Sequence, residues 1–192
     1  MGSRLARVPN TPPDYCPHCG GPLTAVDPPT VHRCADCERE VFYNPTPSAR
    51  VAVVDGDRVL LCSVGNPAAP DQWETPGGRL EAAEDPPVAA ARELREETGL
   101  GVDPASLALF DVRSFETLPG QYKTRLCYAV ARADTEGRLS AGAEPDAVRF
   151  WSPDGLAAAG QSLSERQPAA TRDLGWWLDG ARAVLDGDGS MD

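Results

Sequence analysis

The sequence is poor in lysine: Lys123 is the only lysine among 18 basic residues, and the rest are arginine. Acidic residues number 29, so the formal net charge is −11. A surface with this charge repels polyanions on average, which argues against broad DNA or RNA binding because such binding depends on neutralised phosphates. Either a salt-rich cytoplasm, where screening makes self-repulsion tolerable, or a GC-rich genome that replaces Lys codons explains the composition.

Long apolar runs are also missing. No stretch approaches the roughly 18 apolar residues of a membrane helix, and the first residues, MGSRLARVPNTPPDY, lack the apolar part of a signal peptide. We therefore expect a cytoplasmic protein with no membrane partner. Aromatic content is only 6%, but hydrophobic residues make up 41% of 192 residues, enough for one domain with its own core and a small appendage.

The six cysteines fall into two groups. Two CxxC pairs occur early in the chain and consist of Cys16, Cys19, Cys34 and Cys37. In a cytoplasmic chain this spacing indicates four thiolates around a structural Zn²⁺ rather than disulfides. His18 and His32 are predicted to face solvent, because four sulfurs already complete a tetrahedral site. Cys62 and Cys127 lie within apolar runs and are predicted to be buried strand residues.

Composition and periodicity divide the chain into four parts: a flexible tail over 1–14, a zinc ribbon over 15–45, a main domain over 46–160, and a C-terminal helix with an acidic tail over 161–192. Strand-like runs cover 48–54, 58–64, 107–115, 125–132 and 147–151, and helical patterns cover 86–98 and 167–185. This grouping, without regular βαβ alternation, predicts an α+β sandwich with a mixed sheet.

The C-terminal helical pattern carries apolar residues on one face, namely Leu174, Trp177, Leu178, Ala181 and Leu185. Such a face indicates a helix packed on the sheet. A contact between two copies of the chain is the alternative explanation.

The clearest helix is rich in carboxylates. Asp85 is a suitable N-cap, Pro86 a suitable first-turn residue and Gly99 a suitable stop. Between them three acidic residues share one face at spacings i, i+3 and i+4: Glu93, Glu96 and Glu97. Solvated glutamates are a serious alternative, because a like-charge pair costs a helix only about 0.2–0.5 kcal/mol.

The surroundings of this helix favour a functional explanation. A Gly77-Gly78 turn and another carboxylate, Glu84, precede the helix. Clustered oxygen ligands suit Mg²⁺ or Mn²⁺ bridged to substrate phosphates. Glycines in the turn allow backbone groups to approach a metal or a phosphate closely.

This segment resembles the box that defines Nudix hydrolases. All specified positions are present: Gly78, Glu84, Arg92, Glu93, Leu94, Glu96, Glu97, Gly99 and Leu100. The resemblance covers roughly residues 46–160. It implies an α/β/α sandwich and Mg²⁺-dependent hydrolysis of the pyrophosphate bond in a nucleoside diphosphate linked to another moiety. It leaves the oligomeric state open, with a homodimer as one option because dimers are frequent in that family.

The resemblance also implies residue roles. Metal ligands would come from Glu93, Glu96, Glu97 and the Gly77 carbonyl, with Glu144 as a further candidate before a late strand. One of these glutamates, or Glu84, would activate the attacking water, and Arg92 would position a catalytic carboxylate. Phe115, Tyr122 and Arg125 are candidates for contacts with the substrate.

A four-cysteine ribbon directly before such a domain is similar to the NADH pyrophosphatase subgroup. That subgroup carries SQPWPFPxS after the box, whereas this chain has DVRSFETLPGQYKTR over 111–125. The substrate therefore stays open between NADH- or ADP-ribose-like compounds and nucleoside triphosphates. The competing hypothesis is a regulatory module that senses a nucleotide on a Nudix scaffold, although the chain keeps every box glutamate.

Overall fold

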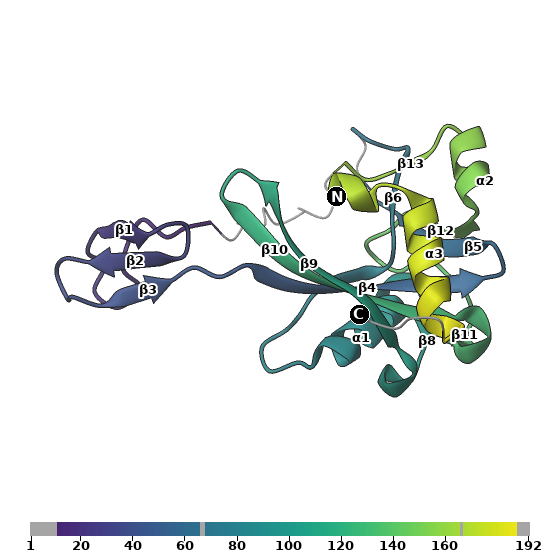
Figure 1. The fold of residues 1–192 in the computed structure, drawn as a ribbon, viewed down its shortest axis with the longest axis horizontal. Helices are drawn as coiled ribbons and strands as arrows, with labels where there is room; N and C mark the ends of the chain where they lie inside the picture. Colours follow the sequence, from purple (N-terminus) through teal and green to yellow (C-terminus); the bar gives the residue numbers. More distant parts are fainter. Residues whose placement is uncertain (1–10, 66–67, 166, 188–192) are drawn as a thin grey trace. The chain divides into compact units, whose positions relative to one another are not determined.

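The structure is a computed structural model that describes residues 11–65, 68–165 and 167–187. The chain divides into two units (Figure 1). The first runs up to Thr46 and includes Ser114–Lys123, and the second holds Pro47–Arg113 and the residues from Thr124 onward. Most of the predicted tail over 1–14 lies outside the described residues.

The first unit contains a small antiparallel sheet in the order β1-β2-β3. Its strands are β1 (Leu23–Asp27), β2 (Val31–Cys34) and β3 (Glu40–Phe42). Backbone hydrogen bonds close a tight turn around the first CxxC pair: the amide of Cys16 donates to Gly21 (2.8 Å), and that of Gly20 donates to Cys16 (2.9 Å). Gly20 has a φ of 78°, a conformation that glycine adopts without strain.

A segment from the middle of the chain also belongs to this first unit, which sequence analysis did not anticipate. The Tyr43 hydroxyl donates a hydrogen bond of 2.8 Å to the carbonyl of Gly120. The amide of Gly120 in turn donates to the Glu116 carboxylate at 2.7 Å. Because Tyr43 is buried, this hydrogen bond is shielded from water.

The main sheet has eight strands and runs in the order β13-β6-β5-β4-β10-β9, with β12 paired to β5 and β7 paired to β4. The strands are β4 (Thr46–Asp55), β5 (Arg58–Ser63), β6 (Gln72–Glu74), β7 (Gly77–Arg79), β9 (Ala108–Leu118), β10 (Gln121–Ala131), β12 (Val148–Trp151) and β13 (Ser162–Leu163). Since β13 is parallel to β6 while β4 and β5 are antiparallel, the predicted mixed sheet is confirmed. A separate ladder joins β8 (Leu100–Gly101) to β11 (Glu136–Gly137).

Helix α1 spans Pro86–Thr98, as the sequence predicts. Asp85 occupies the N-cap position, but its side chain makes no capping hydrogen bond. Gly99 ends the helix with a φ of 72°, and its amide donates to the carbonyl of Arg95. Its buried side consists of Ala89, Ala90, Leu94 and Thr98, whereas Val88 is exposed.

The C-terminal helix α3 spans Leu174–Leu185, a shorter range than the predicted 167–185. The preceding residues form a 3-10 turn over Ala169–Thr171, and Asp173 then caps the helix by accepting from the amide of Gly175 (2.9 Å). Sequence analysis missed α2 (Pro153–Ala158), which is too short for helical periodicity to be visible. Its start is nonetheless marked by Ser152, whose hydroxyl accepts from the amide of Gly155 (3.1 Å).

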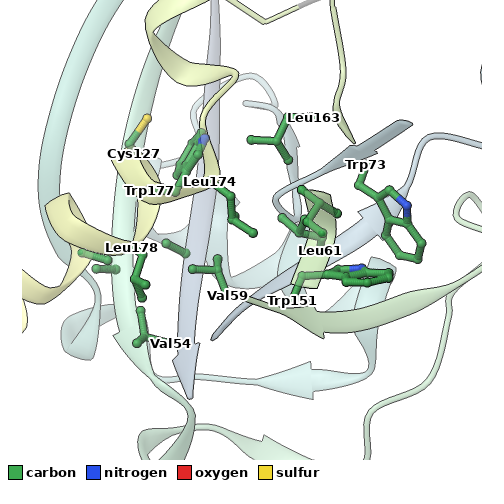
Figure 2. Packing of buried hydrophobic residues seen from close by; sticks show 14 residues of the cluster. Val54, Val59, Leu61, Trp73, Cys127, Trp151, Leu163, Leu174, Trp177 and Leu178 are labelled. Carbon is green, nitrogen blue, oxygen red and sulfur yellow. The ribbon is translucent and has the colours of Figure 1, made fainter. Parts of the chain in front are cut away.

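The sheet separates two apolar clusters in the second unit. Alternate residues of β4 point to opposite sides, so one cluster joins Ala49, Val51 and Val53 to α1, while the other joins Ala52 and Val54 to α3. Figure 2 shows the second cluster, where Leu174, Trp177 and Leu178 of α3 lie against Val54, Val59, Leu61 and Cys127. The predicted packing of α3 on the sheet is therefore confirmed, and with it the sandwich.

Cys62 and Cys127 are buried in β5 and β10, as predicted. Trp73 and Trp151 meet edge to face at 5.5 Å within the same cluster (Figure 2). Within the described part of the chain, no helix has the length and apolar character needed to span a bilayer.

Candidate metal and catalytic sites

The four early cysteines lie close enough to share one metal ion. Their sulfurs all lie within 4.8 Å of one another, with 3.7 Å between Cys16 and Cys37 and 3.5 Å between Cys19 and Cys34. Sulfurs bound to tetrahedral Zn²⁺ at about 2.3 Å are roughly 3.8 Å apart. Hydrogen bonds from the backbone amides of Cys19 and His18 lower the pKa of the Cys16 thiol to about 7, while the pKa of Cys19 is raised by its hydrogen bonds to neighbouring thiols despite the amide of Gly21. The thiols therefore share their protons when no metal is bound. This donor set fits zinc.

The two histidines of the ribbon differ from each other. His18 is exposed, as predicted. His32 is only 8% exposed, so the prediction that it faces solvent is wrong. The reason is strand parity: His32 lies two residues before the buried Cys34 on β2, and alternate residues of a strand share a face.

Arg92 is the centre of the carboxylate site on α1. Its guanidinium donates two hydrogen bonds to the Glu84 carboxylate, one of 2.8 Å from Nε and one of 3.0 Å from Nη2. Its Nη1 donates to Glu93 at 2.9 Å and, more weakly, to Glu96 at 3.3 Å. These hydrogen bonds, chiefly that to Glu84, raise the pKa of Arg92, and they lower the pKa of Glu84. Arg92 therefore ties the loop before the helix to two box glutamates.

Glu97 lies in a different environment one turn after Glu93. The amide of Gly77 donates a hydrogen bond of 2.9 Å to Glu97 Oε2. Burial raises the pKa of Glu97 to about 7, against the opposing charge of Arg50. Without a bound ion, a carboxyl with this pKa exchanges a proton near neutral pH.

The glycine turn is shaped to admit these acids. Gly77 has a φ of 146°, and a Cβ there would overlap the carbonyl of Ala49, because β7 pairs closely with β4. At Gly78 a Cβ would overlap the carboxylate of Glu93. Gly77 therefore needs glycine because of the neighbouring strand, whereas a side chain at position 78 would require the Glu93 carboxylate to move.

Arg50 and Glu74 support the turn and were not identified from the sequence. Arg50, on β4, forms an ion pair with Glu74 on β6 and donates to the carbonyl of Thr75. These interactions fix the backbone just before Gly77. They join strands that are distant in sequence, so no local pattern marks them.

The loop over 138–147 lies against the C-terminal end of α1. The amide of Gly142 donates to the carbonyl of Glu97 at 2.9 Å, and a Cβ on Gly142 would overlap the carbonyl of Glu96. The loop also carries Glu144. Burial raises the pKa of Glu93, Arg92 opposes this rise, and the negative charge of Glu144 adds to it. Glu144 therefore lies near enough to Glu93 for their charges to interact. Gly142 positions this loop against α1, and sequence analysis did not identify it.

The box carboxylates are an all-oxygen donor set, which suits Mg²⁺ or Mn²⁺. Their oxygens are not gathered as closely as the sulfurs: among the described residues, the cysteines are the only set of three or more Cys, His, Asp or Glu ligand atoms within 4.8 Å of one another. Mutual repulsion contributes to the raised pKa values of Glu93 and Glu97, and a bound cation would relieve it. On this ground the donor set fits a divalent ion.

The three candidates for substrate contacts fall in different units. Phe115 and Tyr122 lie on β9 and β10 within the first unit. Arg125 belongs to the second unit, is 3% exposed, and donates to the side-chain oxygen of Gln167 at 3.2 Å. Burial, followed by repulsion from Arg50, lowers the pKa of Arg125 to about 10.

The molecule has a mixed sheet between helices, and an acidic helix follows a glycine turn. It is therefore an α+β sandwich protein with a carboxylate site at one helix. The family model of the NUDIX domain matches residues 44–172 of the chain. Because this match covers more than half of the chain, the chain belongs to the Nudix family.

Several curated proteins resemble part of the chain. The octanoyltransferase of Myxococcus xanthus is 41% identical over 121 residues, which are 60% of this chain and 33% of that protein. The NAD-capped RNA hydrolase NudC of Pseudomonas aeruginosa is 35% identical over 88 residues, 46% of this chain and 31% of that protein. The ADP-ribose pyrophosphatase of Bacillus subtilis is 33% identical over 84 residues, 43% of each protein. The chain thus spans about a third of the length of the first two relatives.

Solved structures share the fold. A NUDIX hydrolase from Nitrosomonas europaea superposes with a TM-score of 0.61 at 20% identity, covering 91% of this chain and 93% of that one. The MutT NUDIX hydrolase from Burkholderia pseudomallei gives 0.55 at 22% identity, with coverages of 71% and 98%. These neighbours confirm the predicted Nudix-type sandwich.

Proposed function

We propose that the chain is a Mg²⁺- or Mn²⁺-dependent hydrolase that splits the pyrophosphate bond of a nucleoside diphosphate linked to another moiety. The observation that carries the proposal is the arrangement of an unbroken box: Arg92 holds Glu84 and Glu93, while Glu97 is buried against the amide of Gly77. Family membership and the resemblance to an ADP-ribose pyrophosphatase and to NudC support it.

In this proposal the divalent ion is held by Glu93, Glu96, Glu97 and the Gly77 carbonyl, with Glu144 as an additional oxygen donor. When bound, such an ion neutralises pyrophosphate oxygens and lowers the pKa of water.

Side chains of the protein would orient the metal ligands and accept the proton of the attacking water. Glu84 is held ionised by Arg92, so we assign it to orienting Arg92 rather than to taking a proton. Arg92 orients Glu93 in turn. A cation bound to Glu97 would lower its raised pKa, so we assign Glu97 to holding the ion and leave the proton of the attacking water to another of the box glutamates.

The substrate class stays broad, namely NADH- or ADP-ribose-like compounds or nucleoside triphosphates, with Phe115, Tyr122 and Arg125 as proposed contacts. The proposal also includes structural Zn²⁺ on Cys16, Cys19, Cys34 and Cys37, and a cytoplasmic location without a membrane or nucleic-acid partner. A homodimer is part of the proposal as well.

The proposal is tested with a panel of NADH, NAD, ADP-ribose, dinucleoside polyphosphates and nucleoside triphosphates, each with Mg²⁺ or Mn²⁺ and with product identification. For at least one compound, we expect the products of cleavage at a P–O–P bridge. Glu97→Gln should lower kcat by at least about 10³-fold, the loss typical of a group that acts in the transition state. Glu136→Gln, at an exposed position on β11, should leave turnover unchanged.

A nucleotide-sensing module would give a different result. It would bind one of these compounds without consuming it, and Glu97→Gln would change affinity alone. Tight binding with no product from any compound would reject the hydrolase proposal.

A further inference from the structure

The tip of the β9–β10 hairpin, residues 114–123, belongs to the same unit as the zinc ribbon. It carries two of the proposed substrate contacts, Phe115 and Tyr122. A two-stranded hairpin on its own is at best marginally stable in water, so the order of such a tip depends on what it contacts. Within the first unit, the ribbon supplies that contact.

Tyr43 joins the ribbon to the tip. Its side chain is only 5% exposed, and its hydroxyl donates a hydrogen bond of 2.8 Å to the carbonyl of Gly120, which has a φ of 75° in the turn between the two strands. Within the tip, the amide of Gly120 donates to the Glu116 carboxylate at 2.7 Å, and Thr117 Oγ1 donates to the carbonyl of Gln121 at 3.1 Å. Tyr43 therefore binds a turn that is held together by hydrogen bonds of its own.

Tyr122 lies beside the groups that hold this turn. The negative charge of Glu116 is the main cause of the raised pKa of Tyr122, and desolvation, a hydrogen bond to Glu116 and the nearby Tyr43 add to it. Glu116 thus interacts with both the turn and Tyr122. A shift of the turn would therefore also shift a proposed substrate contact.

The position of Tyr43 depends in turn on the zinc site. Cys34 ends β2, and its amide donates to the carbonyl of Arg39 at 2.9 Å, so the turn that holds Cys34 and Cys37 leads directly into β3. Tyr43 follows the last residue of β3, and its amide donates to the carbonyl of Thr30 at 2.7 Å. An ion bound by Cys34 and Cys37 would hold this turn closed and thereby keep β3 and Tyr43 in place.

We propose that Tyr43 is a positioning residue for the substrate: it couples the zinc ribbon to the hairpin tip, so that zinc binding sets the affinity for the nucleotide and leaves the chemistry at α1 unchanged. This inference rests on the proposed function, which assigns Phe115 and Tyr122 to the substrate. It gives the ribbon a part in hydrolysis without placing zinc among the catalytic groups.

Amide hydrogen exchange of the full chain tests the coupling without any substrate. Tyr43→Phe removes only the hydroxyl, so the tip amides should exchange about 2-fold to 10-fold faster, the factor that corresponds to one hydrogen bond. The amides of β1 and β2 should keep their protection, and the zinc content should not change. Cys34→Ser, which weakens the zinc site, should speed exchange at the tip by a larger factor. Tyr15→Phe removes a hydroxyl that is 69% exposed on the same ribbon, so this control should exchange like wild type.

Steady-state kinetics of the same variants test the consequence for the substrate. With a compound that the wild type cleaves, Tyr43→Phe should raise KM by a factor similar to that for exchange and leave kcat unchanged, as expected when binding alone is weakened. Cys34→Ser should raise KM further at the same kcat. A cysteine variant is better than a chelator here, because a chelator would also remove the divalent ion proposed at α1.

Several results would overturn the proposal. Equal exchange at the tip in wild type, Tyr43→Phe and Cys34→Ser would show that the ribbon does not hold the tip. Loss of zinc from Tyr43→Phe would mean that Tyr43 supports the ribbon itself. Faster exchange with an unchanged KM, or a lower kcat, would remove the role in substrate binding.

Failure of the proposed function gives a different result, namely that no compound of the panel is cleaved by the wild type. The role of Tyr43 in substrate affinity then falls with that function. The link between zinc, Tyr43 and the tip is still decided by the exchange measurements alone.

Discussion

The ribbon and the carboxylate helix both offer a metal site, but they hold their donors in opposite ways. In the ribbon, sulfurs face one another at 3.5 Å and 3.7 Å. At and before α1, protein groups already bind the carboxylates: Arg92 binds Glu84 and Glu93, and the amide of Gly77 binds Glu97. A site whose donors have no other strong partner depends on its metal for folding, whereas a site with internal partners folds first and binds its metal afterwards.

The cores of the two regions agree with this difference. The buried side chains of the ribbon are few and include Cys16, Cys34, His32 and Tyr43. The second unit has two apolar clusters, one on each side of its sheet. Apolar burial alone can therefore stabilise the second unit but not the ribbon.

The largest expected effect is the loss of zinc from the ribbon. Zinc–thiolate binding contributes about 10–16 kcal/mol to the folding of comparable peptides, so a strong chelator or Cys34→Ser should unfold residues 15–45. Amide NMR should show collapse of the ribbon signals while the signals of β4, β5 and α1 persist. Ribbon signals that survive complete removal of zinc would contradict the comparison.

The next effect concerns Arg92. Arg92→Ala removes the partner that orients Glu84 and Glu93, so turnover should fall by roughly 10²–10³-fold while the fold persists. Steady-state kinetics with thermal unfolding measure both quantities. Arg95→Ala, an exposed neighbour on the same helix, serves as the control and should retain full activity.

A smaller effect is expected at the glycine turn. Gly78→Ala places a methyl group where the Glu93 carboxylate lies, so that carboxylate must move. Turnover should drop by about 10-fold to 100-fold, as is typical when the support of a metal ligand is disturbed. Gly101→Ala, which has open space at its Cβ position, is the matched control. Equal turnover rates for Gly78→Ala and Gly101→Ala would show that turnover does not depend on the present position of the Glu93 carboxylate.

The smallest effect is on stability as pH changes. Burial raises the pKa of Glu97 from 4.5 to about 7, so between these pH values the folded state binds a proton that the unfolded state has lost. Stability of the metal-free protein therefore falls as pH rises from 4.5 through 7, by about 3 kcal/mol. Glu97→Gln has no such ionisation and should be more stable than wild type at pH 8 but not at pH 4.

Wild type, melted over the same pH series, is the comparison for that measurement. Parallel pH profiles for wild type and Glu97→Gln would mean that Glu97 is not desolvated.

Local signals in the sequence were sufficient for some features and not for others. The start of α1 is marked by Asp85 and Pro86 and its end by Gly99, so its bounds are predictable from the local sequence alone. The side on which His32 lies depends on strand parity relative to Cys34, and that parity is known only once β2 is placed. Periodicity in turn cannot reveal α2, which has only six residues.

The supporting residues of the carboxylate site were beyond sequence reasoning. Arg50 meets Glu74 only because β4, β5 and β6 lie next to one another in the sheet. Gly142 is required only because its loop touches the end of α1. Such residues are defined by tertiary approach, whereas the box glutamates are defined by spacing along one helix.

The central claim is that the α1 carboxylates hold a divalent ion beside Gly77 and thereby drive pyrophosphate cleavage. Titration of the full chain with Mn²⁺, followed by electron paramagnetic resonance, tests it most directly when turnover is measured on the same samples. The account predicts that wild type binds Mn²⁺ and turns over substrate, and that Glu97→Gln loses most of both while keeping its fold. Unchanged Mn²⁺ binding and unchanged turnover in Glu97→Gln would contradict it.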